Sequence, residues 1–303
     1  MDDLLEYSII TVSVSRRNQT LAIRIYNNLV SNSSQRLLGH NADKLGQVFA
    51  RVSSGVRIQK SADDSAGMMT SELLKSDSRT LKQGIRNLNE GISLLNVADG
   101  AIQEEVSIVI RMREIAIQSA TGTIGSTERQ TTQMEFSAMR SEFDRIAKTT
   151  EFNGKKLLDG SLSSKAKDHL SLQFGLSSND LNRTNINREV NIQSLKAQDL
   201  NFNSLSIATQ EGAVKASEEM EKVLGDLSSI RGRLGTTQNR IGRTLNSTLV
   251  AIQNFTAAGS MIKDADLASE IANLTKHQIL VQSSSAMIGQ ANLFPQGAIS
   301  LLP

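Results

Sequence analysis

The 303-residue chain contains no cysteine and no tryptophan, and both of its prolines, Pro295 and Pro303, stand at the C-terminal end. Without cysteine, disulfides, thiolate metal ligands and cysteine nucleophiles are excluded. Aromatic residues make up only 3% of the chain, so aliphatic side chains must form the core. Such a core suits thin layers of helices, and the proline-free first 294 residues allow those helices to be long.

Charge and hydropathy exclude two further classes of partner. The chain has 33 basic and 31 acidic residues and a net charge of +2, and its basic residues are spread out without interleaved aromatics, so we expect no nucleic-acid binding. The apolar run from Ser8 to Val14 is short, rich in hydroxyls and not preceded by a basic segment. We therefore expect neither a membrane span nor a secretory signal, and a secreted chain would need another export route.

Apolar residues recur at coiled-coil spacing near both ends of the chain. The first stripe is Leu38, Ala42, Leu45, Phe49, Val52 and Val56, and the second is Leu267, Ile271, Leu274, Gln278, Val281, Ser285 and Ile288. A helix buries such a stripe only against another helix. The two ends therefore either return to each other or seek partners in other chains.

A third stripe follows the middle of the chain, at Leu81, Ile85, Leu88, Ile92, Leu95, Asp99, Ile102, Val106, Val109, Arg113 and Ala116. Gly84 and Gly91 lie seven residues apart inside it and so share one face of the helix. We interpret these glycines as places where another backbone comes close.

The complete pattern predicts a mainly α fold, a long helical hairpin or coiled-coil bundle formed by the N- and C-terminal halves around a small β-hairpin and irregular middle. Asp63 and Asp64 are expected to cap the second helix, and paired turn residues around 152–160 predict a hairpin. Leu170, Leu172 and Phe174 alternate as in a strand. The predicted helices run from 23 to about 52, from 61 to 120, from 128 to 148, from 211 to a polar step at 259–266, and from there to a break at Pro295.

A search for catalytic chemistry finds no candidate. His40, His169 and His277 are isolated from one another, and none has a second histidine at metal-ligand spacing. Asp63 and Asp64 could be read as a metal pair, but with no third ligand nearby helix capping is the better interpretation. Phosphate-binding and nucleophile-elbow motifs are absent from the sequence. We expect no catalytic residue, metal or cofactor, and hence no enzyme.

Several motifs in order resemble those of the bacterial flagellins. At the N-terminal side they are RVSSGVRI at 51–58, SADDSAG at 61–67, GISLL at 91–95, ADGA at 98–101, REIAIQSA at 113–120 and FNG at 152–154. At the C-terminal side they are DAD at 264–266, QIL at 278–280, QAN at 290–292 and PQ at 295–296. The resemblance covers about Ile23–Gly160 and Leu205–Leu302.

The resemblance implies a subunit of the flagellar filament, exported unfolded by the flagellar type III system. Its partners would be further copies of itself, an export chaperone, the filament cap and the hook–filament junction proteins. The filament lies outside the cell, or in the periplasm where flagella are internal. The alternatives are a hook–filament junction adaptor of similar plan, or an enzyme or adhesin displayed on such a scaffold, which would need a larger central insert.

The resemblance also implies a domain plan. Residues 23–60 and 260–303 would form the two halves of the filament-core coiled coil, and 61–160 and 205–259 those of a surrounding helical domain of the D1 type. The short variable connector at 161–204 predicts a thin, smooth filament of two layers.

The core-packing positions are expected to be Leu38, Ala42, Leu45, Phe49, Val52, Leu267, Ile271, Leu274, Val281 and Ile288. Polar residues on the terminal seams, such as Gln278 and Ser285, leave these helices too weakly apolar for a stable solitary hairpin. We therefore expect them to fold on assembly, and polar substitution at Leu45, Leu274 or Val281 to abolish filaments.

Two further expectations concern a surface and the N-terminus. Arg111, Ile115 and Glu135 match positions by which some flagellins are bound by a Toll-like receptor, although contacts between subunits are the stronger interpretation. Residues 1–22 match nothing in the flagellin pattern. We expect them to reflect a misplaced start site, with initiation near Leu21, and the alternative is a genuine tail in a specialised subunit.

Overall fold

The structure is a computed structural model that describes residues 28–299, with side chains as far as Leu293. The expected extension at 1–22, the start near Leu21 and the beginning of the first helix at 23 lie outside the described residues. The chain divides into two compact units. The terminal unit comprises, in its described part, residues 28–63 and 263–299, and the central unit comprises residues 64–262.

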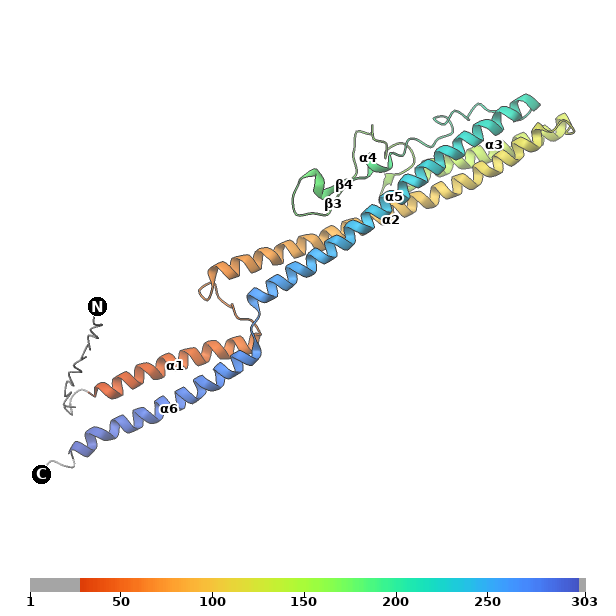
Figure 1. Cartoon of the computed structure of the whole chain (residues 1–303). Helices are drawn as coiled ribbons and strands as arrows, with labels where there is room; N and C mark the ends of the chain where they lie inside the picture. The colour runs from red at the N-terminus through yellow and green to blue at the C-terminus, as the bar shows by residue number, and fades with distance from the viewer. Residues whose placement is uncertain (1–27, 300–303) are drawn as a thin grey trace, which may run out of the picture. The chain divides into compact units, whose positions relative to one another are not determined.

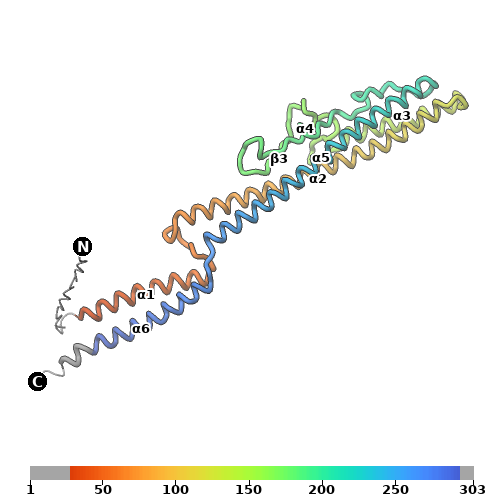
Figure 2. The backbone as a smooth tube through the Cα atoms, viewed as in Figure 1, coloured from red at the N-terminus to blue at the C-terminus, as the bar shows by residue number. Residues whose placement is uncertain are grey.

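The terminal unit is a hairpin of two helices that come from opposite ends of the sequence. Helix α1 spans Leu29–Ser54 and helix α6 spans Leu267–Ile299, and Figure 2 shows the two backbones side by side. Helix α1 ends at Gly55, whose φ of 69° lets its N–H return to the carbonyl of Arg51. This end agrees with the stop predicted at 53–55.

The connecting segment that follows α1 and the one that precedes α6 are also paired with each other. The N–H of Arg57 donates to the carbonyl of Lys263 at 2.7 Å, and the N–H of Ala265 donates to that of Gly55 at 2.9 Å. These hydrogen bonds hold together the end of the hairpin at which α1 finishes and α6 begins.

Two predicted boundaries at the C-terminal side were wrong. Helix α5 passes through Gly259 and ends only at Lys263, because a single glycine costs a helix about 1 kcal/mol and a long packed helix tolerates it. Helix α6 continues past Pro295 to Ile299. Proline removes the hydrogen bond to the carbonyl four residues earlier and crowds that carbonyl; here the carbonyl, of Ala291, accepts instead from the side chain of Asn28 at 2.7 Å.

The central unit is built on two very long helices. Helix α2 spans Ser65–Ala120 and α5 spans Gln210–Lys263, and Figure 1 shows them running alongside each other, with α3, Ser126–Thr149, beside them. Ion pairs join α2 to α5, from Arg231 Nε to Asp99 Oδ1 at 3.0 Å and from Arg113 Nη2 to Glu221 Oε2 at 2.9 Å. Their pairing order makes the two helices antiparallel.

The middle of the chain packs small elements against these helices. Strands β1, Glu151–Phe152, and β2, Lys155–Lys156, form a hairpin whose turn residues Asn153 and Gly154 both have positive φ, as a two-residue turn of type I′ requires. Strand β3, Ser171–Gln173, pairs antiparallel with β4, Arg183–Asn185. A 3-10 turn η1, Asp180–Asn182, and a short helix α4, Ile186–Val190, complete the elements. The mainly α fold with a small β middle is thus confirmed.

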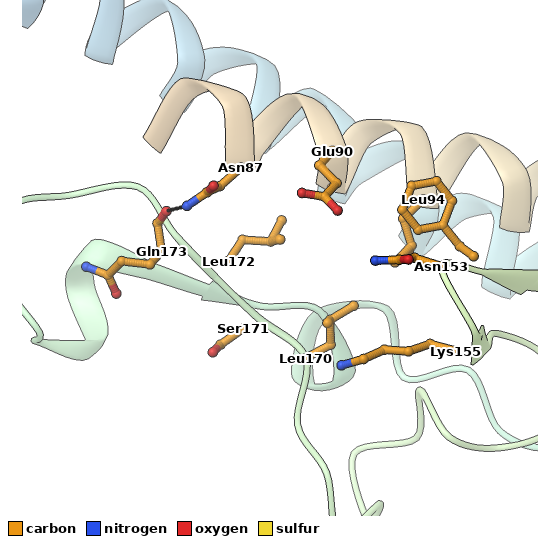
Figure 3. A pocket seen from close by; sticks show the side chains of 11 residues that line it. Asn87, Glu90, Leu94, Asn153, Lys155, Leu170, Ser171, Leu172 and Gln173 are labelled. Atoms are coloured by element: carbon orange, nitrogen blue, oxygen red, sulfur yellow. Dashed lines mark hydrogen bonds between the residues drawn. The ribbon is translucent and has the colours of Figure 1, made fainter. Parts of the chain in front are cut away.

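The two glycines that share a face of α2 lie under this β region. A Cβ atom on Gly84 would lie 2.9 Å from Phe174 Cα and closer still to the Phe174 carbonyl, so a second backbone does pass there as predicted. At Gly91 the close neighbour is instead the Leu172 side chain, which Figure 3 shows lying toward α2. Both glycines therefore serve the contact between α2 and the segment 172–174, which comprises the end of β3 and the residue after it.

Candidate functional site

The contact between α1 and α6 is a heptad seam with steps of three and four residues. The buried and half-buried residues that define it on α1 are Ser31, Ser34, Leu38, Asn41, Leu45, Val48 and Val52. Those on α6 are Glu270, Leu274, His277, Val281, Ser284, Ile288 and Ala291. This spacing is the geometry of a coiled coil.

Small and polar side chains occupy much of this seam. Helices α1 and α6 contact each other along its length. Asn41 Nδ2 donates to Ser284 Oγ at 3.4 Å, and Arg51 Nη1 lies 3.6 Å from Glu270 Oε1. The second Glu270 oxygen and His277 Nδ1 are buried without a hydrogen-bond partner among the described side chains. The seam is therefore close but only weakly apolar.

The structure divides the expected core-packing positions between two rows. Leu38, Leu45, Val52, Leu274, Val281 and Ile288 are half-buried on the seam. Ala42, Phe49, Leu267 and Ile271 are exposed beside it, Phe49 to 62%. These four do not pack within the hairpin, because the helices face each other through residues one position earlier, such as Asn41, Val48 and Glu270.

Helix α6 is also apolar on the side turned away from α1. Ala272, Ile279, Ala286 and Leu293 are exposed at strict seven-residue intervals, opposite the seam, and Ile279 is 60% exposed. No acidic or basic residue occurs from His277 to Leu293. The surface of α6 from residue 278 to 293 is therefore uncharged, with apolar residues among serine and glutamine, and such a surface suits burial against other chains better than a charged one. No helix in the described range 28–299 is both long and apolar enough to cross a bilayer.

On the central unit, Arg111 and Glu135 form an exposed ion pair between α2 and α3. Arg111 Nη2 lies 3.1 Å from Glu135 Oε1, and Arg111 Nη1 lies 3.0 Å from Glu114 Oε2. These contacts raise the pKa of the Arg111 guanidinium, chiefly through the hydrogen bond to Glu114. Ile115 does not belong to this surface. It is only 1% exposed and lies in the apolar core of the unit, so the expected surface role of Ile115 is corrected.

The two candidate cap residues have different tasks. Asp64 is the N-cap of α2, and its Oδ1 accepts from the Gly67 N–H at 2.9 Å. Asp63 Oδ2 accepts from the N–H groups of Gln59 and Lys60 at 3.1 and 3.0 Å. These hydrogen bonds lower the pKa of the Asp63 carboxyl, that to Lys60 most. Asp63 therefore fixes the loop before α2 and does not cap the helix.

A cavity of about 330 Å³ lies between α2 and the β region (Figure 3). Its lining includes Leu94, Leu170 and Leu172, with the side chains of Glu90 and Lys155 nearby. No group of three or more His, Asp or Glu residues in the described part of the chain could hold a metal ion.

The sequence interpretation missed one unusual core residue, Glu105. Its side chain is fully buried in α2, and neither carboxylate oxygen has a hydrogen-bond partner in the described structure. Burial raises the pKa of this carboxyl to about 9. The signal was present, because continuing the face shared by Gly84 and Gly91 in steps of seven leads to Ala98 and then to Glu105.

Comparison with known proteins agrees with these features. Residues 25–163 match the bacterial flagellin N-terminal helical region, and residues 217–302 match the bacterial flagellin C-terminal helical region. The flagellar filament 30.7 kDa core protein of Treponema maltophilum is 36% identical over 286 residues, which cover 92% of this chain and 99% of that protein.

Flagellins of other bacteria give similar matches. Flagellin of Halalkalibacterium halodurans is 35% identical over 281 residues, and flagellin of Bacillus subtilis is 32% identical over 312 residues, each covering 92% of this chain. These relatives are filament proteins by name, which favours a filament subunit over a junction adaptor. The chain belongs to the bacterial flagellin family and is a non-enzymatic structural protein that polymerises into the flagellar filament.

Proposed function

We propose that the terminal hairpin is the part of the chain through which neighbouring filament subunits contact one another. The observation that carries this proposal is the second apolar row of α6, at Ala272, Ile279, Ala286 and Leu293. The chain's own α1 covers the opposite side of α6, so this row is left for another chain. Its seven-residue spacing matches that of a helix packed in a coiled coil.

The exposed residues beside the seam belong to the same proposal. Phe49 on α1 and Leu267 and Ile271 on α6 are large and apolar, and the hairpin itself does not bury them. An open helical polymer needs two different contact surfaces on each subunit. The exposed apolar residues of α1 and α6 would supply these two contact surfaces. The half-buried seam residues Leu45 and Val281 would hold the two helices of the hairpin together.

Seeded growth of filaments tests the proposal. The purified chain would be added to filament seeds and imaged by electron microscopy, and the wild-type chain should extend them. Ile279→Asp should abolish extension because it places a charge in the apolar row, whereas Ile279→Leu keeps the volume and should extend the seeds normally. Normal growth of the Ile279→Asp variant would contradict a contact at this row.

Folding of the central unit provides the control. Ile279 lies in the terminal unit, so the thermal unfolding of residues 64–262, followed by circular dichroism, should be the same for both variants and the wild type. A variant with an altered central transition would be unfolded more generally, and Ala272→Asp would then replace it in the same row.

We also propose the partners that the family resemblance implies. Export unfolded through the flagellar type III system, with a chaperone, the filament cap and the junction proteins as partners, agrees with a terminal unit that is weakly apolar on its own. The Arg111–Glu135 pair is accessible to a neighbouring subunit or to a Toll-like receptor. Growth of seeds by a variant with both residues changed to alanine, compared with receptor activation by the same variant, would separate these two roles.

A further inference from the structure

We propose that Asn28 and Pro295 act together as a clamp that closes the open end of the terminal hairpin, with Asn28 as a positioning residue for assembly. The inference rests on the proposed function of the hairpin and adds a specific device to it. One end of the hairpin is held by the paired segments around Gly55 and Lys263. At the other end, where α1 begins and α6 approaches its C-terminus, no backbone–backbone hydrogen bond joins the two helices among residues 28–299.

Pro295 creates an unpartnered acceptor near this open end. In an α-helix the N–H of each residue bonds the carbonyl four positions earlier, and proline has no N–H. Helix α6 remains helical through Pro295 to Ile299, so the carbonyl of Ala291 receives no such bond. Ala291 is only 3% exposed, so water has little access to this carbonyl, and a buried carbonyl without a partner is destabilising.

The side chain of Asn28 supplies the missing donor. Its Nδ2 donates to the Ala291 carbonyl at 2.7 Å, while its Oδ1 accepts from the Ser31 N–H at 3.0 Å and so caps α1. One amide therefore satisfies an orphan donor of α1 and an orphan acceptor of α6. An aspartate or serine would cap α1 equally well, but neither combines this acceptor with an N–H donor of the same reach.

A neighbouring contact fixes the same end. Ser31 Oγ donates to Asn292 Oδ1 at 2.9 Å, one residue beyond the carbonyl that Asn28 holds. Together these contacts place the start of α1 at one level of α6. In a regular α-helix every carbonyl before that of Ala291 accepts an N–H from four residues later, so Asn28 would find no free backbone acceptor at an earlier turn of α6. The clamp thereby sets which part of each helix is offered to a neighbouring subunit.

Disulfide trapping in filaments tests the clamp. The chain contains no cysteine, so Ser31→Cys and Asn292→Cys introduce a single reporter pair at the open end. Reporter chains would be incorporated as a minority component during seeded growth with wild-type chains. The rate of intramolecular disulfide formation under a fixed oxidant then measures how often this end is closed, and non-reducing gels separate it from links between chains.

Four reporter chains form a cycle: unchanged, Asn28→Asp, Pro295→Ala, and both changes. Asn28→Asp keeps the cap acceptor and removes the donor, so it should slow disulfide formation by about five-fold, as expected for one lost hydrogen bond. Pro295→Ala restores an N–H to the Ala291 carbonyl, so in that background Asn28→Asp should change the rate little. Asn32→Asp, the same chemical change at an exposed position one turn later in α1, is the matched control and should have no effect.

The possible outcomes decide the matter. If Asn28→Asp slows the reaction equally in both backgrounds, or in neither, Asn28 does not act through the carbonyl that Pro295 frees, and the proposal is overturned. If Asn28→Asp chains are excluded from filaments but the double variant is incorporated, the proposal is supported, and exclusion of both overturns it. Failure of the wild-type chain to extend seeds would instead overturn the proposed function of the hairpin.

Discussion

Replacing Glu105 with glutamine should make the central unit more stable, and increasingly so as the pH rises. The wild-type carboxyl is fully buried, and burial raises its pKa from 4.5 to about 9. Between these two values the folded chain keeps the proton whereas the unfolded chain loses it. The folded state therefore binds more protons, and the free energy of unfolding falls as the pH rises from 4.5 to about 9.

The size of the effect follows from the width of that interval. Each pH unit above 4.5 contributes about 1.4 kcal/mol, so the penalty at pH 7 is at most about 3.5 kcal/mol. Relaxation of the core around a charge would reduce it. For a unit of 150–250 residues, 1 kcal/mol corresponds to about 2–4 °C in Tm, so Glu105→Gln should raise the Tm at pH 7 by at most about 7–14 °C. At pH 4.5 the difference should be much smaller, because the wild-type carboxyl is then neutral in the folded state and still half protonated in the unfolded state.

Thermal unfolding of the monomeric chain between pH 4.5 and 8, followed by circular dichroism, would measure this change. The test depends on how the Tm difference between Glu105→Gln and the wild type changes with pH. Its value at a single pH is not decisive, since a buried amide at this position has its own cost of burial. Glu104→Gln, at the exposed position next to it in α2, is the matched control. Parallel pH profiles for the wild type and Glu105→Gln would refute a buried carboxyl that is neutral in the folded state.

Three further predictions concern local structure. Gly84→Ala should destabilise the central unit by more than about 1 kcal/mol in urea unfolding, because the new Cβ atom would meet the Phe174 backbone. Gly100→Ala, in the open part of the same helix, should instead stabilise the unit by about 0.5–1 kcal/mol. Equal effects of the two substitutions would contradict the close approach at Gly84. Asp64→Ala should lower the free energy of unfolding by about 1 kcal/mol through loss of the N-cap of α2, and Asp64→Asn should lower it much less. If both substitutions left the urea unfolding unchanged, the capping role of Asp64 would be contradicted. In dilute monomer the amides of residues 267–290 should exchange hydrogen rapidly and become protected in filaments, so strong protection before assembly would show that the hairpin is stable alone.

Much of the fold could be read from the sequence because its local signals are strong. Gly55 ends α1 and Asp64 begins α2, each with the backbone geometry or hydrogen bond expected of that residue type. Asn153 and Gly154 specify the tight β turn. The two errors have different causes: a long helix tolerates the small cost of Gly259, whereas at Pro295 a tertiary contact compensates. A residue that weakens an isolated helix is tolerated where tertiary contacts supply what it lacks, as Asn28 does for the carbonyl of Ala291.

The functional surfaces were harder to predict, since apolar residues can serve either the core of the subunit or an exposed contact surface. Arg111 and Glu135 lie on the surface as expected, but Ile115 belongs to the core, and nothing in the apolar pattern of α2 distinguishes it from the exposed Ile117. Glu105 was missed because an acidic residue on a long helix is usually solvated. Only its place in the three-dimensional packing makes it unusual.

The sequence by itself determined the family, the long helices, several of their ends and one of the two seam rows in each terminal helix. The tertiary structure alone decided the second row. The apolar pattern favoured the positions of Ala42, Phe49 and Ile271, but the helices meet through Asn41, Val48 and Glu270, one residue earlier. The physical reason is that pairing of two helices buries only the face that the other helix covers, and polar contacts such as Asn41–Ser284 and Arg51–Glu270 lie on that face together with aliphatic residues such as Leu45 and Val281. The larger apolar residues beside it are thereby left exposed, and burial of an apolar side chain depends on which surface comes to cover it.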